Sequence, residues 1–313
     1  SYGKYTGKGA PFYEAAPEVV ETVNLAIKLG RPILVEGEAG CGKTKLASAI
    51  AHELDLGHPI SITVKSTSHA RDLLYKFDAL RRLQDVQNPT NLEARYIYPY
   101  IFLQPFGSAI SNGKPCVVLI DEIDKADIDF PNDLLEVVDQ FFFDIEDLPE
   151  AESALCLKHK GFGRRVEVSR SDRPIVVVTS NREKQLPEPF LRRCLYIFWL
   201  SFPKDSEILK SIVKKNLDAS LDHVSEELIS EAVRRFLDVR YESEKLGAQK
   251  KPATSELIDW VNALHWQGKT GQEVGAGGLR PVYWRLLFKT MQDLDVYDRH
   301  TQDIDASNAD RNG

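Results

Sequence analysis

The sequence predicts an α/β fold in which a parallel sheet is flanked by helices and followed by a small all-helical domain. Three apolar runs, beginning at residues 33, 116 and 175, each lead into a Gly-rich or polar segment. Short runs of this kind are typical of strands buried on both faces of a parallel sheet. From residue 206 to residue 298, by contrast, apolar residues recur only at helical spacing. This change predicts a boundary between two domains near residue 200.

The first apolar run leads into a loop, GEAGCGKT, which a helical pattern follows. The loop has the complete G-x-x-x-x-G-K-[ST] pattern in its strand-to-helix context. Glycines let the backbone direct several N–H groups at one anion, so we expect the loop to bind the phosphates of ATP. Lys43 would reach the β- and γ-phosphates, and the Thr44 hydroxyl would coordinate Mg²⁺. The alternative is a Gly-rich turn that binds nothing. The expected nucleotide-binding residues are Gly37, Glu38, Ala39, Gly40, Cys41, Gly42, Lys43 and Thr44.

Two acidic residues, Asp121 and Glu122, follow the second apolar run. Ligands of open α/β sheets bind at the carboxyl ends of the strands. We expect Asp121 to hold Mg²⁺ directly or through a water, and Glu122 to orient and polarise the water that attacks the γ-phosphate. An ordinary solvated loop can also follow a strand with two acids. The phosphate loop upstream favours the catalytic interpretation.

The third apolar run ends in a polar triplet, Thr179-Ser180-Asn181. A strand-end amide beside the acidic pair could hydrogen-bond both the γ-phosphate and the attacking water. Asn181 could instead be a helix cap or a turn residue. We therefore treat Asn181 as a candidate for the catalytic site, with the structural role as the alternative.

Three arginines are candidates for contacts with the phosphates. Arg192 and Arg193 lie on a short predicted helix, and arginine is suited to neutralising charge on a transferring phosphoryl group. Arg280 follows a segment with four glycines and stands at the expected start of the last helix. A hinged lid could bring Arg280 to the phosphates from there.

Two segments interrupt the regular α/β pattern. Residues 65–115 are long for a connection and are predicted to form an insertion with its own hairpin or short helix; helical spacing is present in residues 71–83, and residues 96–106 are aromatic and broken by prolines. The alternative is that these aromatic residues pack on the core. Residues 141–170 predict a hairpin around a long polar loop at 148–163. Cys156 and His159 form a C-x-x-H pair in that loop, which without a second pair does not indicate a metal site.

The outer segments of the chain have their own patterns. Residues 1–12 have no apolar period and are expected to form an arm, and a helix is predicted at 18–29. In the second domain, helices are predicted at 208–217, 226–237, 255–266 and 281–294. The polar tail at 301–313 is expected to be disordered.

Composition narrows the class of protein. A chain of 313 residues with 42% hydrophobic and 28% charged residues is typical of a soluble globular protein. The N-terminal segment lacks the apolar core of a signal peptide and no 18-residue apolar run occurs, so we expect a cytoplasmic protein without membrane insertion. The net charge of −7 argues against chain-wide attraction to nucleic acid and leaves room for a local basic patch.

Four widely spaced cysteines predict reduced thiols. Cys41 could be redox-sensitive at a helix N-terminus, or simply a small tolerated side chain.

Taken together, the motifs resemble the AAA+ ATPases, and the match is closest to the MoxR family. The segments that carry the resemblance are GEAGCGKT, VVLIDEID, VVVTSN, LPEPFLRRC and GAGGLRP, in this order and before a helical domain. The resemblance implies a nucleotide-binding domain at 1–200 and a helical lid at 201–300. It also makes residues 65–115 the helix-2 insert and residues 141–170 the pre-sensor-1 hairpin.

The resemblance implies a role for each candidate residue. Lys43 and Thr44 would be the Walker A pair, Asp121 and Glu122 the Walker B pair, Asn181 sensor 1, Arg193 the arginine finger and Arg280 sensor 2. Because Arg192 directly precedes Arg193, either of the two could be the finger.

Members of the family form rings, typically hexamers, that use ATP to remodel or mature other proteins, often with a partner that carries a von Willebrand factor A domain. The resemblance therefore implies a homo-oligomeric ATPase with a protein client. One alternative is a DNA-associated translocase or clamp-loader-like ATPase, against which the acidic net charge argues. Another is a nucleotide-gated switch or scaffold, which would not need the complete hydrolysis set of Glu122, Asn181 and Arg193.

Overall fold

The computed structural model describes residues 2–10, 13, 15–38, 40–87, 92–200, 202–217 and 224–312. The chain forms two compact units, one of residues 1–37 and 42–200 and the other of residues 38–41 and 201–313. The second unit thus begins, after the loop segment 38–41, where the purely helical pattern begins in the sequence. Among the described residues, no helix combines the length and the apolar character needed to cross a membrane.

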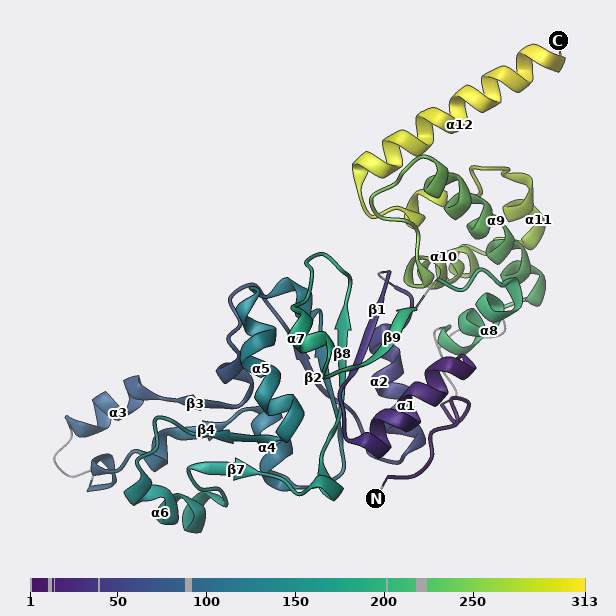
Figure 1. The fold of residues 1–313 in the computed structure, drawn as a ribbon. Helices are drawn as coiled ribbons and strands as arrows, with labels where there is room; N and C mark the ends of the chain where they lie inside the picture. Colours follow the sequence, from purple (N-terminus) through teal and green to yellow (C-terminus); the bar gives the residue numbers. More distant parts are fainter. Residues whose placement is uncertain are drawn as a thin grey trace. The chain divides into compact units, whose positions relative to one another are not determined.

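The first unit is built on a five-stranded parallel sheet (Figure 1). The order of its strands is β2-β5-β8-β1-β9. Their bounds are β1 (Ile33–Gly37), β2 (Ile60–Thr63), β5 (Val117–Asp121), β8 (Ile175–Ser180) and β9 (Leu195–Leu200). In register, Ile120 lies opposite Val178, and Val178 lies opposite Leu34. The carboxyl ends of β1, β5 and β8 therefore meet at one edge of the sheet, as the predicted parallel sheet requires.

Helices cover both faces of this sheet because successive strand side chains point to opposite faces. Ile33 and Val35 share an apolar cluster with α1 (Pro17–Leu29) and α2 (Lys43–Glu53). Leu34 belongs to the cluster on the other face. The helices of that second cluster are α4 (Pro105–Asn112), α5 (Asp129–Gln140), α6 (Glu150–Lys160) and α7 (Glu188–Leu191).

The N-terminal segment, expected to be an arm, packs on the first unit. Tyr5 is fully buried in the cluster of α1 and α2, and the Asn24 side chain bonds both the N–H and the carbonyl of Tyr5. The Glu53 carboxylate accepts the N–H groups of Thr6, Gly7 and Gly9. Tyr2 packs against the same cluster, so a few apolar side chains and a set of backbone hydrogen bonds, rather than a hydrophobic period, hold this segment.

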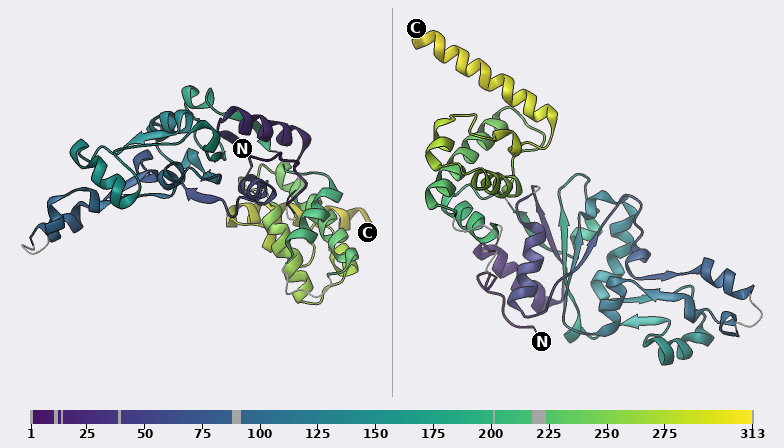
Figure 2. Two further views of the ribbon diagram at one scale, coloured as in Figure 1. Left: turned by 90° about the horizontal axis from the view of Figure 1, so that it is seen from below. Right: turned by 180° about the vertical axis from the view of Figure 1, so that it is seen from behind.

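Two antiparallel hairpins form a lobe on one side of the sheet (Figure 2). We define the lobe as the described parts of residues 70–103 and 142–167. Its elements are η1 (Ala70–Leu73), β3 (Tyr75–Phe77), α3 (Ala79–Val86), η2 (Leu92–Arg95), η3 (Tyr98–Tyr100), β4 (Ile101–Leu103), β6 (Phe142–Asp144), α6 and β7 (Arg165–Glu167). Each of the two insertions thus contributes one pair of antiparallel strands. Short 3-10 turns, η4 (Ile123–Lys125) and η5 (Arg170–Asp172), lie elsewhere in the unit.

One pattern in the lobe covers several elements, and one local prediction is wrong. The helical spacing of residues 71–83 does not correspond to one helix, because residues 75–77 pair with residues 101–103 and α3 begins only after Asp78, whose carboxylate accepts the N–H of Arg81. The segment 148–163 is not simply a polar loop, since it contains α6. That helix has acidic residues in its first turn and basic residues in its last turn, which suits the helix dipole, and it buries Cys156.

The α6 helix joins the two insertions into one body. The Glu152 carboxylate accepts the N–H groups of Ile97 and Tyr98, at 2.7 and 3.0 Å. The Lys160 ammonium donates to the carbonyls of Pro99 and Ile101, both at 2.8 Å. The His159 ring stacks on that of Tyr98, with the ring centroids 5.6 Å apart.

The aromatic residues of the first insertion pack within the lobe. Tyr100 is buried and its hydroxyl donates to Asp85. Tyr98 is half-buried beside His159. The packing alternative therefore describes these two side chains in the structure.

The second unit is helical. Its helices are α8 (Ser206–Asn216), α9 (Glu226–Lys245), α10 (Thr254–Trp266), α11 (Gly271–Ala276) and α12 (Met291–Asn312), with a 3-10 turn η6 (Trp284–Leu287) before α12. Apolar side chains including Phe236, Trp260 and Tyr297 form its core.

The end of the second unit differs from the prediction in two ways. The helix expected at 281–294 is broken, because Tyr283 has a left-handed backbone (φ 59°) and a new helix begins at Met291, where the Thr290 hydroxyl accepts the N–H of Asp293. The tail expected to be disordered is helical as far as Asn312. Its first residue, Thr301, is buried and accepts a hydrogen bond from the guanidinium of Arg280, a tertiary contact that the polar composition does not indicate.

Candidate active site

The phosphate loop connects β1 to α2 and closes over its own lysine. Gly42 has φ 97° directly before the helix begins at Lys43, a conformation strained for any residue with a Cβ atom. The Lys43 side chain is buried, and its ammonium donates to the carbonyl of Gly37 at 2.8 Å. The ammonium is therefore held at the loop by the chain itself. Ala39, an expected nucleotide contact, lies outside the described residues.

The loop segment 38–41 belongs to the second unit. Within that unit, the Arg240 guanidinium bonds to the Glu38 carboxylate, and the Lys251 ammonium lies 3.6 Å from the same carboxylate. The Thr254 hydroxyl donates to the carbonyl of Gly40. No recognisable sequence motif marks Arg240, which lies within α9.

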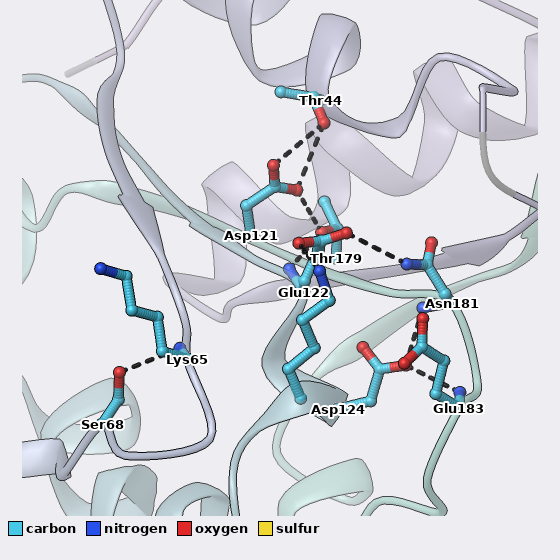
Figure 3. Close-up of polar contacts among 10 residues, drawn as sticks. Thr44, Lys65, Ser68, Asp121, Glu122, Asp124, Thr179, Asn181 and Glu183 are labelled. Carbon is cyan, nitrogen blue, oxygen red and sulfur yellow. Dashed lines mark hydrogen bonds and ion pairs between the residues drawn. The ribbon is translucent and has the colours of Figure 1, made fainter. Parts of the chain in front are cut away.

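Thr44 and Asp121 meet at the carboxyl edge of the sheet (Figure 3). The Thr44 hydroxyl lies 3.2 and 3.3 Å from the two carboxylate oxygens of Asp121. The hydroxyl of Thr179, from β8, donates to Asp121 Oδ1 at 2.5 Å. The expected Mg²⁺ ligands are thus brought together, and Thr179 orients the carboxylate. A hydroxyl and a carboxylate are the hard oxygen donors that Mg²⁺ prefers, so the pair fits this ion.

Glu122 lies beside this pair and is held by three groups. Its N–H donates to the Thr179 hydroxyl at 2.9 Å. Its carboxylate lies 2.5 Å from the Lys125 ammonium and accepts a hydrogen bond of 3.3 Å from the side-chain amide of Asn181. The hydrogen bond to Glu122 raises the pKa of Lys125, so the ammonium stays charged beside the carboxylate. The structure therefore brings Asp121, Glu122 and Asn181 together.

No sequence motif marks the residues that orient this group. Thr179 belongs to the polar triplet at the end of β8, and Asp124 and Lys125 follow the acidic pair. Asp124 is 2% exposed, and its carboxylate accepts the N–H groups of Asn181 and Glu183. The available signal was the position of Asp124 two residues after Glu122, on the same short turn.

Two of the three candidate arginines lie at the surface of the first unit. The Arg192 side chain is 73% exposed and pairs with Glu188 one helical turn earlier. The Arg193 side chain is 42% exposed and lies 3.9 Å from the Asp139 carboxylate. Within the described contacts, neither guanidinium bonds to Asp121, Glu122 or Asn181, so the structure does not place them at the acidic pair.

Arg280 lies between α11 and η6, rather than at the start of a helix as expected. Its guanidinium donates to the Thr301 hydroxyl at 2.6 Å and to the carbonyl of Asp298 at 2.8 Å, and it lies 3.4 Å from the Asp298 carboxylate. These contacts tie Arg280 to α12 within the second unit.

Most of the first unit matches the model of a known protein family. The model of a family described as "ATPase family associated with various cellular activities (AAA)" matches residues 33–202. The denitrification regulatory protein NirQ of Pseudomonas aeruginosa is 38% identical over 65 residues, which cover 20% of this chain and 24% of NirQ. This chain thus aligns with about a quarter of that curated relative. A mutant of RuvB from Thermotoga maritima has a similar structure over 79% of this chain and 69% of its own, with a TM-score of 0.42 and 13% identity.

Proposed function

This chain belongs to the AAA family of ATPases, and we propose that it hydrolyses ATP as a MoxR-type ring protein that remodels partner proteins. The observation that supports hydrolysis best is the cluster of Asp121, Glu122 and Asn181 beside Thr44. A protein that only binds a nucleotide has no need of a carboxylate and an amide held next to the metal ligands. This cluster favours an enzyme over a switch or scaffold.

Binding of the nucleotide uses the phosphate loop and the Thr44–Asp121 pair. Lys43 would exchange the Gly37 carbonyl for the β- and γ-phosphate oxygens. Thr44 and Asp121 would hold Mg²⁺, which neutralises negative charge on the phosphates when it is bound. Thr179 keeps the Asp121 carboxylate oriented, since its hydroxyl donates to Oδ1.

Hydrolysis is assigned to Glu122 and Asn181. The Glu122 carboxylate would accept a proton from water as the water oxygen bonds to the γ-phosphorus and the bond to the ADP oxygen breaks. Lys125 and Asn181 fix the carboxylate before the substrate arrives. The Asn181 amide would also donate to the γ-phosphate or align the water.

We also propose that the chain assembles into a homo-oligomeric ring, typically a hexamer in the family that it resembles. The exposure of Arg192 and Arg193 supports an arginine finger that acts on a neighbouring subunit. Of the two, Arg193 is proposed as the finger on the resemblance; its guanidinium donates to the Pro189 carbonyl at 3.1 Å and lies 3.9 Å from the Asp139 carboxylate, contacts that it would exchange for phosphate oxygens of the neighbouring subunit. Arg280 is proposed as sensor 2, after release from Asp298 and Thr301.

We propose that the chain acts in the cytoplasm and that its client is a protein and not DNA. The net charge of −7 does not favour a polyanionic substrate. The lobe shares the apolar core of the first unit, and α6 holds its two insertions together, as expected of an element that transmits force to a client. NirQ is named as a regulatory protein. A partner with a von Willebrand factor A domain remains part of the proposal on the resemblance alone.

The test measures the ATP turnover of the native chain under three conditions. The chain is assayed alone, with duplex or single-stranded DNA, and with a protein kept unfolded by reduction and carboxymethylation. We expect stimulation by the unfolded protein and no response to DNA. Stimulation by DNA alone would contradict the protein-remodelling proposal and favour the translocase. Turnover that responds to neither would remove the support for an unfolded chain as the client.

A further inference from the structure

The turn that follows β8 is held by side-chain acceptors at three successive backbone N–H groups. The N–H groups of Asn181 and Glu183 donate to the same oxygen, Oδ2 of Asp124, at 3.1 and 2.8 Å (Figure 3). Between them, the N–H of Arg182 donates to the Ser180 hydroxyl at 3.0 Å. This turn has no ladder or helix hydrogen bonds of its own, so these side chains decide its shape.

The conformation of the turn requires such support. Arg182 has φ 60°, in the left-handed region that is unfavourable for a residue with a Cβ atom. The two N–H groups bound by Asp124 flank this residue on both sides. Asp124 therefore fixes the chain on either side of the strained position.

Asp124 makes these contacts from a costly location. It is 2% exposed, and among the described residues its other carboxylate oxygen, Oδ1, has no hydrogen-bond partner. A buried acid with an unpartnered oxygen is unfavourable, so a purely structural tie could be made more cheaply by a neutral group. The same short turn, η4, begins directly after Glu122.

We propose that Asp124 is a positioning residue for hydrolysis, which sets the Asn181 amide against the Glu122 carboxylate. The contacts form a closed path: Asp124 lies two residues from Glu122, binds the N–H of Asn181, and the Asn181 side chain returns to Glu122 Oε1 at 3.3 Å. Asp124 contacts neither Thr44 nor Asp121 within the described structure, so it acts through Asn181. The inference rests on the proposed ATPase function and assigns a further residue to that site.

The variant Asp124→Asn keeps the shape of the side chain and one acceptor oxygen, but it loses the charge that strengthens both hydrogen bonds to the turn, so the N–H groups of Asn181 and Glu183 are held less firmly. We expect kcat for ATP to fall about tenfold or more, since displacement of a catalytic group by an ångström can cost a hundredfold. The KM for ATP and the affinity for a non-hydrolysable ATP analogue should stay within about twofold of native, because Asp124 has no contact with the phosphate loop. Asp127→Asn, at an exposed acid three residues further on, is the matched control and should leave kcat unchanged.

A double-mutant cycle separates positioning from general destabilisation. If Asp124 acts through Asn181, kcat of Asp124→Asn combined with Asn181→Ala should equal that of Asn181→Ala alone. Multiplied losses, or a native kcat for Asp124→Asn, would overturn the inference. A uniform loss of kcat and ATP binding with a lowered Tm would also overturn it, because that result describes destabilisation.

Amide exchange provides a measurement that does not depend on ATP turnover. In the native chain the amides of Asn181 and Glu183 should exchange slowly, although they lie outside strands and helices, and Asp124→Asn should accelerate both. Fast exchange of these amides in the native chain would overturn the inference. A native chain with slow exchange but without ATP turnover would instead contradict the proposed function, so the two failures are distinguishable.

Discussion

The Thr44 hydroxyl lies 3.2 Å from an oxygen of Asp121, although 77 residues separate the two positions in the chain. The first turn of α2, directly after the phosphate loop, supplies one residue and the end of β5 supplies the other, and β8 lies between β1 and β5 in the sheet. The parallel register thus places a hydroxyl and a carboxylate where one Mg²⁺ can bind both.

The first prediction concerns Mg²⁺. Thr44→Val removes the hydroxyl and keeps the shape of the side chain, so the Mg²⁺ concentration for half-maximal ATP turnover should rise about tenfold or more. Thr44→Ser keeps the hydroxyl and should remain close to native. Turnover measured across a Mg²⁺ titration checks both variants, and removal of Mg²⁺ with EDTA should stop turnover in all of them. A native Mg²⁺ dependence for Thr44→Val would contradict the assignment of this hydroxyl as a ligand.

Lys43 should determine the affinity for ATP. Lys43→Met replaces the ammonium by an apolar group of similar length, and the loss of charge-assisted hydrogen bonds to phosphate should weaken ATP binding about tenfold to a hundredfold. Titration with a fluorescent ATP analogue measures this change. The matched control is Lys45→Met on the exposed side of the same helix turn, which should bind as the native chain does. Equal losses in the two variants would argue against a specific phosphate contact.

Arg193 should act on the neighbouring subunit. Arg193→Ala and Glu122→Gln are each expected to lose about a hundredfold or more of the ATP turnover, because one lacks the finger and the other lacks the water-orienting carboxylate. A mixture of the two variants should recover activity, since some sites then combine Glu122 of one chain with Arg193 of another. Arg192→Ala tests the adjacent arginine in the same way. If size-exclusion chromatography shows that the two variants assemble together and the mixture stays inactive, the finger does not act between subunits.

Glu53 should make the stability of the first unit depend on pH. Burial disfavours the charge of Glu53, but the hydrogen bonds from Thr6, Gly9 and Gly7 outweigh it and lower its pKa. A pKa that is lowered on folding stabilises the folded state above the ordinary carboxyl pKa, and this stabilisation is lost as the pH falls towards the lower folded value.

The corresponding variant is Glu53→Gln. We expect its free energy of unfolding to be lower than native by about 1 kcal/mol at pH 7, a typical net value for hydrogen bonds of this kind. The difference should be constant down to about pH 5 and shrink below the ordinary pKa of 4.5. Urea unfolding at a series of pH values measures this difference in stability, and Glu21→Gln, at an exposed position of α1, is the control. The same pH profile in both variants would contradict the role of Glu53.

The phosphate loop and the acidic pair could be predicted because their information is local. The phosphate-loop motif, GEAGCGKT, predicts a strand, a loop and a helix within a few residues, and each apolar run predicts a buried strand. The roles of Thr179 and Asp124 could not be predicted in this way. They depend on the register of β5 against β8, which places position 179 beside position 121, and no local pattern encodes that register.

The lobe and the C-terminal helix were predicted less well because long-range contacts decide them. Apolar residues within 71–83 recur at helical spacing, but the pairing of β3 with β4 more than twenty residues later fixes residues 75–77 as a strand. In the tail, polar composition favours disorder, whereas Thr301 is buried and bonded to Arg280. In both cases a tertiary contact overrides the local preference.

The most direct test of the central claim is the rate of ATP hydrolysis per subunit as a function of protein concentration, for the native chain and for Glu122→Gln. The account predicts that native turnover rises steeply with concentration, as subunits complete one another's sites, whereas Glu122→Gln binds ATP and shows at least a hundredfold less turnover. A native chain that binds ATP tightly and fails to hydrolyse it at any concentration would contradict the ATPase assignment and favour a nucleotide-gated switch.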